Sequence, residues 1–148
     1  MRFGFSTDVK VRFAETDAQG IAHHANYLIW FEAARIEYLS RFGGGYRQLQ
    51  EEGIEALTLD AQVAFRAPAR FDDRLTISAR CTDVRGARFR FEYRVERDGA
   101  LIAEGSTGHA CADARTLRPT RIPAWLIAEI SAAEAEAEAE AEAEESSS

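Results

Sequence analysis

One run of residues limits the fold more than any other: the segment 27–42, which reads YLIWFEAARIEYLSRF. Residues at helical spacing form a stripe along this segment, which consists of Leu28, Phe31, Arg35, Tyr38 and Phe42. Other apolar residues widen this stripe to most of the circumference, so the rest of the protein must enclose the predicted helix. The glycines at 43–45 end the helix, and Asn26 is expected to cap its start.

Most other segments alternate between apolar and polar residues, which is typical of half-buried strands. They cover residues 9–14, 57–65, 75–81, 88–96 and 101–113. Asp98-Gly99 separates the last two segments and predicts a tight hairpin turn. Short helices are expected over 46–52 and in PAWLIAEI near the C-terminal end. A strand, a long helix and then four strands predict an α+β fold, in which one antiparallel sheet wraps around the helix.

Charge is distributed unevenly along the chain. The formal net charge is −7, but without the seven glutamates between Glu134 and Glu145 the acidic and basic residues balance at 18 each. This balance gives no indication of a nucleic-acid partner. We expect one domain over residues 1–130, followed over 131–148 by a low-complexity Ala/Glu tail. Like charges four residues apart oppose a helix there, so disorder or a frayed helix is predicted.

The sequence also bears on location. No apolar run reaches the roughly 18 residues of a membrane span, and the first residues lack the apolar stretch of a signal peptide. Cys81 and Cys111 lie in strand-like runs and form neither a disulfide framework nor a CxxC pair. We therefore expect two buried, reduced thiols and a cytoplasmic protein.

The densest polar stretch outside the tail is AETDAQGIAHHANY, residues 14–27. It joins the first predicted strand to the start of the buried helix. Taken alone, Asp17 is more expected in an Asx-turn or a helix cap than in an active site. His23 and His24 are adjacent, which makes it difficult for both to bind one metal ion, and no metal site is predicted.

This stretch and the following helix resemble a known signature, T-D-x-x-G, H-x-x-Y and then E-x-A-R. The matching residues are Thr16, Asp17, Gly20, His24, Tyr27, Glu32, Ala34 and Arg35. Further on, FRAPARFDDRL fits the same pattern through Pro68, Asp73 and Leu75. Over residues 7–128 the chain thus resembles the hotdog-fold acyl-CoA thioesterases of the 4-hydroxybenzoyl-CoA thioesterase-like family.

The resemblance implies a five-stranded antiparallel sheet in the order 1-3-4-5-2, wrapped around a long central helix. It implies a homodimer or homotetramer with active sites at the subunit interface. It also implies hydrolysis of an acyl-CoA, with no cofactor apart from the coenzyme A of the substrate. The catalytic position falls to Asp17, assisted by a histidine, and the spacing to Tyr27 favours His24 over His23.

Thioester hydrolysis explains why these residue types would be needed. A carboxylate must attack the carbonyl carbon or activate water, so Asp17 is expected to be the nucleophile or the general base. Backbone N–H groups between His23 and Ala25, at the helix start, are expected to polarise the carbonyl. Gly20 would permit the tight path between these parts. The predicted substrate-binding residues are Gly20, Ile21, Ala22, His23, Ala25, Tyr27 and Glu32.

Other residues receive secondary roles. Tyr27 is expected to line the acyl pocket and Glu32 to pair with Arg35 or another arginine, while His109 is interpreted as structural. The phosphates of coenzyme A need cations, and the turn DVRGARFR offers Arg85, Arg88 and Arg90. A solvated strand face explains these three arginines equally well. Arg66 and Arg70 are weaker candidates.

Alternative functions differ in chemistry. The substrate could be a thioester of an acyl carrier protein in place of coenzyme A. The protein could also be a non-catalytic hotdog that binds acyl-CoA, although the presence of Asp17 argues against this. A hotdog hydratase or dehydratase is a further rival, but the differently placed Asp/His pair of such enzymes is not found on the predicted helix.

Overall fold

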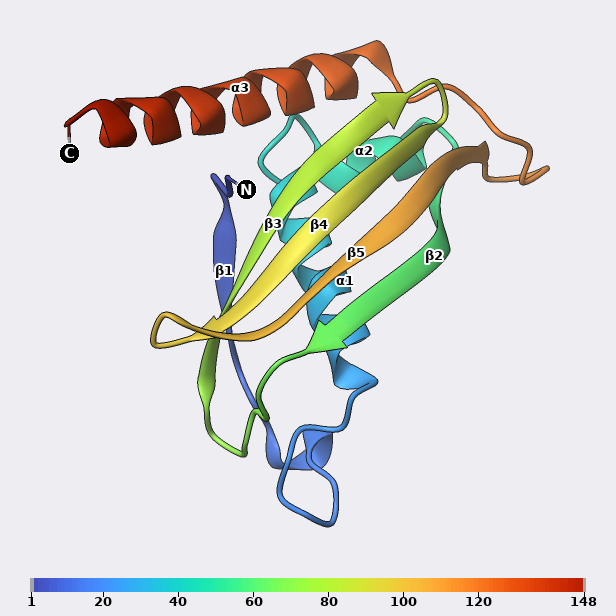
Figure 1. The fold of residues 1–148 in the computed structure, drawn as a ribbon. Coiled ribbons are helices and arrows are strands. Elements are labelled where there is room, and N and C mark those ends of the chain that lie inside the picture. Colours follow the sequence, from blue (N-terminus) through green and yellow to red (C-terminus); the bar gives the residue numbers. More distant parts are fainter. Residues whose placement is uncertain (1, 148) are drawn as a thin grey trace.

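A computed structural model of the chain describes residues 2–147 (Figure 1). One antiparallel sheet has the strand order β1-β3-β4-β5-β2, which confirms the predicted hotdog arrangement. Its strands are β1 (Ser6–Lys10), β2 (Ile54–Phe65), β3 (Arg74–Arg85), β4 (Arg88–Arg97) and β5 (Ala100–Asp113). The helices are the 3-10 turn η1 (Phe13–Glu15), α1 (Asn26–Leu39), α2 (Gly45–Glu51) and α3 (Ala124–Ser147).

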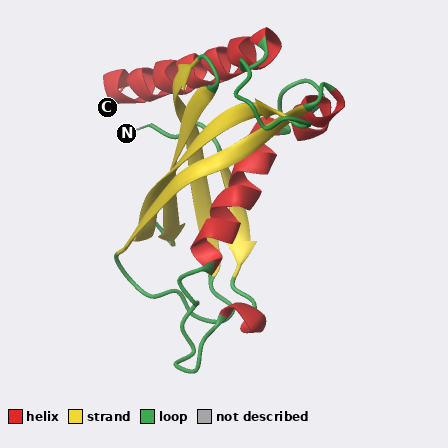
Figure 2. Cartoon of the chain, turned by 90° about the vertical axis from the view of Figure 1, so that its right-hand side faces the viewer, coloured by secondary structure: helices red, strands yellow, loops and turns green. Residues whose placement is uncertain are grey.

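The core lies between α1 and the face of the sheet that α1 crosses (Figure 2). α1 buries one side of its surface, which consists of Tyr27, Trp30, Phe31, Ala34, Tyr38 and Leu39. Leu28, Ile29 and Ile36 remain substantially exposed on the other side. The prediction of a helix enclosed on nearly every side is therefore fulfilled only in part within one chain, because the sheet covers a single face.

Several local predictions can be compared with the structure. Asp98 and Gly99 both have positive φ, 51° and 83°, and they form the predicted turn between β4 and β5. The first strand ends at Lys10, because the chain turns into η1 and leaves Phe13 exposed. Cys81 and Cys111 are buried free thiols, as expected.

Asn26 does not cap α1 in the expected way. The capping position belongs to Ala25, and Asn26 is the first residue of the helix. The side-chain amide of Asn26 donates to the backbone oxygens of Glu15, at 2.8 Å, and His23, at 3.2 Å. Asn26 therefore fastens the helix to the preceding loop through its donor group, whereas a cap would use its oxygen.

The C-terminal segment, for which disorder or a frayed helix is expected, is helical in the structure. α3 continues to Ser147 and passes above the N-terminal residues (Figure 1). Leu126 and Ile130 anchor its first half in the core, and this nucleates the helix that the Ala and Glu residues, good helix formers, then extend. No helix within residues 2–147 is both long and apolar enough to cross a membrane.

Candidate active site

Residues 16–25 form a compact loop between η1 and α1 at one end of the sheet (Figure 1). Thr16 pairs with Ala22 in an isolated antiparallel bridge, and the amide of Asp17 donates to the oxygen of Ile21 at 2.8 Å. Gly20 closes the loop with a φ of 77°, a left-handed conformation that glycine adopts without strain. The predicted role of Gly20 in a tight backbone path agrees with this geometry.

Asp17 lies in this loop and is exposed to solvent. Its Oδ1 atom accepts hydrogen bonds from the amides of Gln19, at 2.8 Å, and Ile21, at 3.3 Å. No described donor reaches Oδ2. The turn-forming and the catalytic interpretation of Asp17 are therefore compatible: one oxygen holds the loop, and the other is free to react.

The two histidines have different environments, although their rings are stacked with centroids 4.2 Å apart. Nδ1 of His23 accepts a hydrogen bond from the amide of Ala25 at 3.2 Å, so this ring satisfies a donor at the start of α1. His24 lines the neighbouring pocket. This difference agrees with the preference for His24 as the residue that meets the substrate.

Three backbone amides, those of His23, His24 and Ala25, are candidates for polarising a carbonyl. The His23 amide donates to the oxygen of Glu15 at 2.7 Å, and the Ala25 amide to His23. In the described part of the chain, no group accepts a hydrogen bond from the His24 amide. Only one of the three donors is therefore available to a ligand.

An apolar pocket of about 340 Å³ opens beside the loop. It is lined by Ile21, Ala22, His24, Tyr27, Phe65, Arg66, Ala67 and Pro68. The Tyr27 ring meets Phe65 edge-on, with centroids 5.0 Å apart, and burial raises the pKa of its hydroxyl. Tyr27 thus lies where an acyl-pocket residue was predicted. Phe65, Ala67 and Pro68 also line the pocket, although the sequence indicates only the strand exit that contains them and no role in the site.

Other predicted substrate residues lie outside this pocket. Gly20, His23 and Ala25 shape the loop. Glu32 lies two turns along α1, where two smaller hollows of about 130 and 170 Å³ run between α1 and β2. Arg35 donates to the hydroxyl of Tyr93 at 3.1 Å, and within residues 2–147 Glu32 forms no ion pair. The expected pairing of Glu32 with Arg35 or another arginine is therefore not found within residues 2–147.

The arginines predicted for coenzyme A lie far from Asp17 in the same chain. Arg85 and Arg88 flank the turn between β3 and β4, at the end of the sheet opposite the loop (Figure 1). With Arg90 they line a pocket of about 240 Å³, where Arg90 already pairs with Asp60 at 3.1 Å. A single chain therefore does not bring the predicted phosphate site and the catalytic loop together.

Arg66 and Arg70, the weaker candidates, lie closer to Asp17. Arg66 lines the apolar pocket and pairs with Glu104 at 2.6 Å. The backbone of Arg70 bridges that of Ile21 in the loop. These positions make the two residues the better placed cations within one chain.

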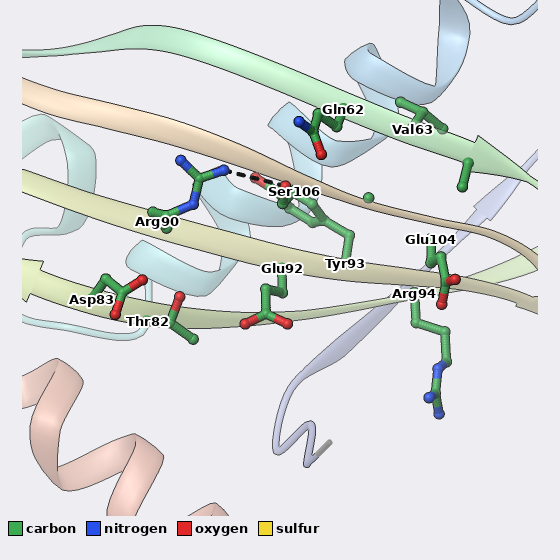
Figure 3. Close-up of a pocket in the computed structure, with 12 residues that line it drawn as sticks. Gln62, Val63, Thr82, Asp83, Arg90, Glu92, Tyr93, Arg94, Glu104 and Ser106 are labelled. Carbon is green, nitrogen blue, oxygen red and sulfur yellow. Dashed lines mark hydrogen bonds between the residues drawn. The ribbon is translucent and has the colours of Figure 1, made fainter.

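Two further features are separate from this site. A hollow of about 420 Å³ lies on the sheet face turned away from α1, where Arg90 donates to Ser106 at 3.3 Å (Figure 3). His109 is buried in the interior, as expected of a structural residue, with Nε2 2.7 Å from the hydroxyl of Thr107. Burial lowers the pKa of His109 to about 4, so the ring is neutral at pH 7.

Comparison with known proteins gives a consistent result. The model of the thioesterase-like superfamily matches residues 11–130. The acyl-CoA thioesterase YbgC of Haemophilus influenzae is 34% identical over 125 residues, which cover 81% of this chain and 89% of the relative. A hypothetical protein of Thermus thermophilus superposes with a TM-score of 0.80 and 38% identity, over 86% of this chain and 97% of the other. A DHNA-CoA thioesterase of Staphylococcus aureus gives a TM-score of 0.80 at 28% identity, over 88% and 93%.

Proposed function

Because the chain belongs to the thioesterase-like superfamily, we propose that it hydrolyses an acyl-CoA to the free acid and coenzyme A, at the loop that carries Asp17. One observation carries this proposal. Oδ2 of Asp17 and the amide of His24 belong to the same tight loop beside an apolar pocket, and neither has a hydrogen-bond partner within residues 2–147. These are the two groups that the reaction needs.

The Asp17 carboxylate has two possible routes. As a nucleophile, it bonds to the carbonyl carbon, the C–S bond breaks, and the thiolate of coenzyme A leaves. Water then hydrolyses the resulting anhydride, which releases the acid and restores the carboxylate. As a general base, Asp17 takes a proton from water while the water oxygen attacks the carbonyl carbon, and that proton then passes to the departing thiolate. In both routes, negative charge develops on the former carbonyl oxygen.

The amide of His24 is the donor that we assign to this developing charge. It lies just before the first turn of α1, where unpaired N–H groups carry partial positive charge. The His24 ring, which lines the pocket, orients the thioester or the attacking water. An ordinary thiol such as that of cysteine has a pKa of about 8.5, so a thiolate departs without a strong acid. The proposed chemistry accordingly uses no resident cofactor.

A homodimer would complete the site. β2 is an edge strand that carries half-exposed Leu59 and Phe65, and α1 also has an exposed apolar side. If β2 pairs antiparallel with the partner's β2 about a twofold axis, its Phe65 end lies beside the partner's Ile54 end. In each protomer, the turn between β3 and β4 lies at the Ile54 end of β2. Arginines from one protomer would then face the Asp17 loop of the other, which resolves their separation within one chain.

The reaction is tested by thiol release from short, long and aromatic acyl-CoAs and from acyl carrier protein thioesters. Asp17→Asn retains an oxygen for the two loop amides and removes the reactive carboxylate, so kcat is expected to fall by about 10²- to 10⁴-fold. Asp113→Asn is the matched control, because Oδ1 of Asp113 also accepts two backbone amides, at 2.8 and 3.0 Å. Turnover of Asp17→Asn at the parent rate contradicts the mechanism. Binding without turnover in the whole panel identifies a non-catalytic acyl-CoA protein.

The dimer is tested separately, by sedimentation velocity and by kinetics of Arg88→Ala. We expect a dimer or tetramer, and a KM for acyl-CoA raised about tenfold by the loss of a phosphate partner. The same variant should retain its KM for an acyl-pantetheine, which lacks the nucleotide phosphates. A monomer with full activity, or an equal change for both substrates, contradicts the proposed arrangement.

A further inference from the structure

Glu15 is a buried carboxylate at the base of the catalytic loop, with 5% of its surface exposed. It ends the 3-10 turn η1, two residues before Asp17. Removing a carboxylate from water is costly unless hydrogen bonds replace the lost hydration. The residues around Glu15 therefore have to supply donors, and they do so from both sides of the loop.

Donors from two residues, one on each side of the loop, reach the carboxylate. Oε1 accepts the backbone amide of Arg12 at 2.8 Å, and Oε2 accepts the indole N–H of Trp30 on α1 at 3.0 Å. The guanidinium of Arg12 also donates to Oε2, at 3.4 Å. Burial alone would raise the pKa of Glu15, but the hydrogen bonds from Arg12 and Trp30 outweigh it and lower the pKa. The side chain is thus an ionised link between the start of the loop and the second turn of α1.

The backbone oxygen of Glu15 makes a second pair of contacts. It accepts the amide of His23 at 2.7 Å and the side-chain amide of Asn26 at 2.8 Å. His23 directly precedes the residue whose amide we assign to the carbonyl oxygen. One residue therefore fastens the outgoing arm of the loop, the returning arm and α1 to one another.

We propose that Glu15 is a positioning residue, which holds Asp17 and the His24 amide in register by linking η1 to Trp30 on α1. This role rests on the proposed function of the loop. Glu15 faces the interior and does not line the pocket, so it acts through the groups that it holds. Because a misplacement of about 1 Å can cost about 100-fold in rate, loosening this link is expected to affect kcat more than substrate binding.

Glu15→Gln tests the proposal with little change in size. The carboxamide keeps one acceptor and puts an NH₂ group against either Trp30 or Arg12, both of which are donors there. Hydrogen exchange of the Gln19, Ile21 and His23 amides is expected to accelerate about tenfold. kcat should fall about 10- to 100-fold, with KM changed less than about threefold. Glu92→Gln is the control, since it removes a carboxylate that is half-buried against Arg80 on the sheet.

Trp30→Phe extends the test to a double-mutant cycle. It removes the indole donor, so the NH₂ group of Glu15→Gln no longer faces another donor there. The double variant should then lose no more activity than the worse single variant. Additive losses of activity contradict the proposal, and so does unchanged exchange of the loop amides in Glu15→Gln.

Failure of this proposal is distinguishable from failure of the proposed function. The exchange measurement needs no turnover, so it decides whether Glu15 holds the loop even if every thioester is left intact. Faster exchange with a parent value of kcat contradicts the positioning role. A fully active Asp17→Asn variant removes the catalytic role of the loop, while the exchange result for Glu15→Gln stands.

Discussion

The ring of Phe31 on α1 lies parallel to the ring of Tyr93 on β4, with centroids 4.2 Å apart and 2° between their planes. This stack sets how closely the helix approaches the sheet. The approach requires a residue without a side chain at position 105 of β5. A Cβ atom built on Gly105 would lie 2.6 Å from the Phe31 ring and 2.4 Å from the backbone oxygen of Gln62.

We expect Gly105→Ala to destabilise the protein, because backbone and a stacked ring cannot move aside easily. Overpacking of this kind costs about 2 kcal/mol and should lower Tm by about 6 °C. Gly108→Ala is the matched control on the same strand. Its Cβ would meet the ends of the Asp60 and Arg90 side chains, which are able to shift. Calorimetry that finds equal Tm values for the two variants would contradict this account of the core.

The attachment of α3 gives a second prediction. The carboxylate of Glu134 accepts a hydrogen bond from the hydroxyl of buried Tyr38 and another from the amide of Cys81, at 3.4 Å. Glu134→Ala leaves the Tyr38 hydroxyl without its partner, at a cost of about 1–3 kcal/mol. Glu136→Ala changes an exposed residue of the same helix and should alter the free energy of unfolding by less than about 0.5 kcal/mol. Urea titrations of both variants check the difference.

The fold was largely predictable where local patterns decide the structure. The apolar run after Asn26 specifies the buried helix, and Asp98-Gly99 specifies a turn. Each of these signals consists of residues that are close together in the sequence. The order of the strands came from the resemblance to a family. For the tail, the sequence leaves disorder and a frayed helix as alternatives, because the contact between Glu134 and Tyr38 that attaches α3 joins residues far apart in the sequence.

The candidate site was predictable in the same sense. The loop that contains Asp17 and Gly20 is local, so its residue types indicate its shape. Phe65 is the last residue of β2 and contacts Tyr27, which lies far away in the sequence, so no short pattern encodes that contact. Whether an amide is already bonded depends on such contacts too, as shown by the His23 amide, whose partner is eight residues away.

His109 provides a prediction on pH. Burial and the nearby charge of Arg35 lower its pKa to about 4 in the folded protein, from 6.5 as the ordinary value. Between these two pH values, His109 binds a proton in the unfolded chain but not in the folded protein. The free energy of unfolding is therefore at its full value above pH 6.5 and decreases as the pH falls towards 4. From pH 7 to pH 5 the loss is about 2 kcal/mol.

His109→Gln isolates this contribution, because other groups titrate equally in both proteins. Urea titrations at pH 7 and pH 5 should show a smaller decrease in unfolding free energy for the variant, by about 2 kcal/mol. A direct check is the NMR titration of the His109 ring, which should remain neutral at pH 5.5. Parallel pH dependences for the two proteins would mean that the ring is not desolvated in solution.

The two adjacent histidines should separate stability from activity. His23→Ala removes the acceptor of the Ala25 amide, so it should lower the free energy of unfolding by about 1 kcal/mol, as loss of a helix cap does. His24→Ala removes a pocket side chain that makes no hydrogen bond within residues 2–147, so it should lower kcat/KM about 10- to 100-fold, with stability almost unchanged. Urea titration and thiol release on the same preparations measure both effects. The opposite pattern, with His23→Ala inactive and His24→Ala unstable, would reverse the assignment. His23 would then be the residue that meets the thioester, and His24 the one that stabilises the fold.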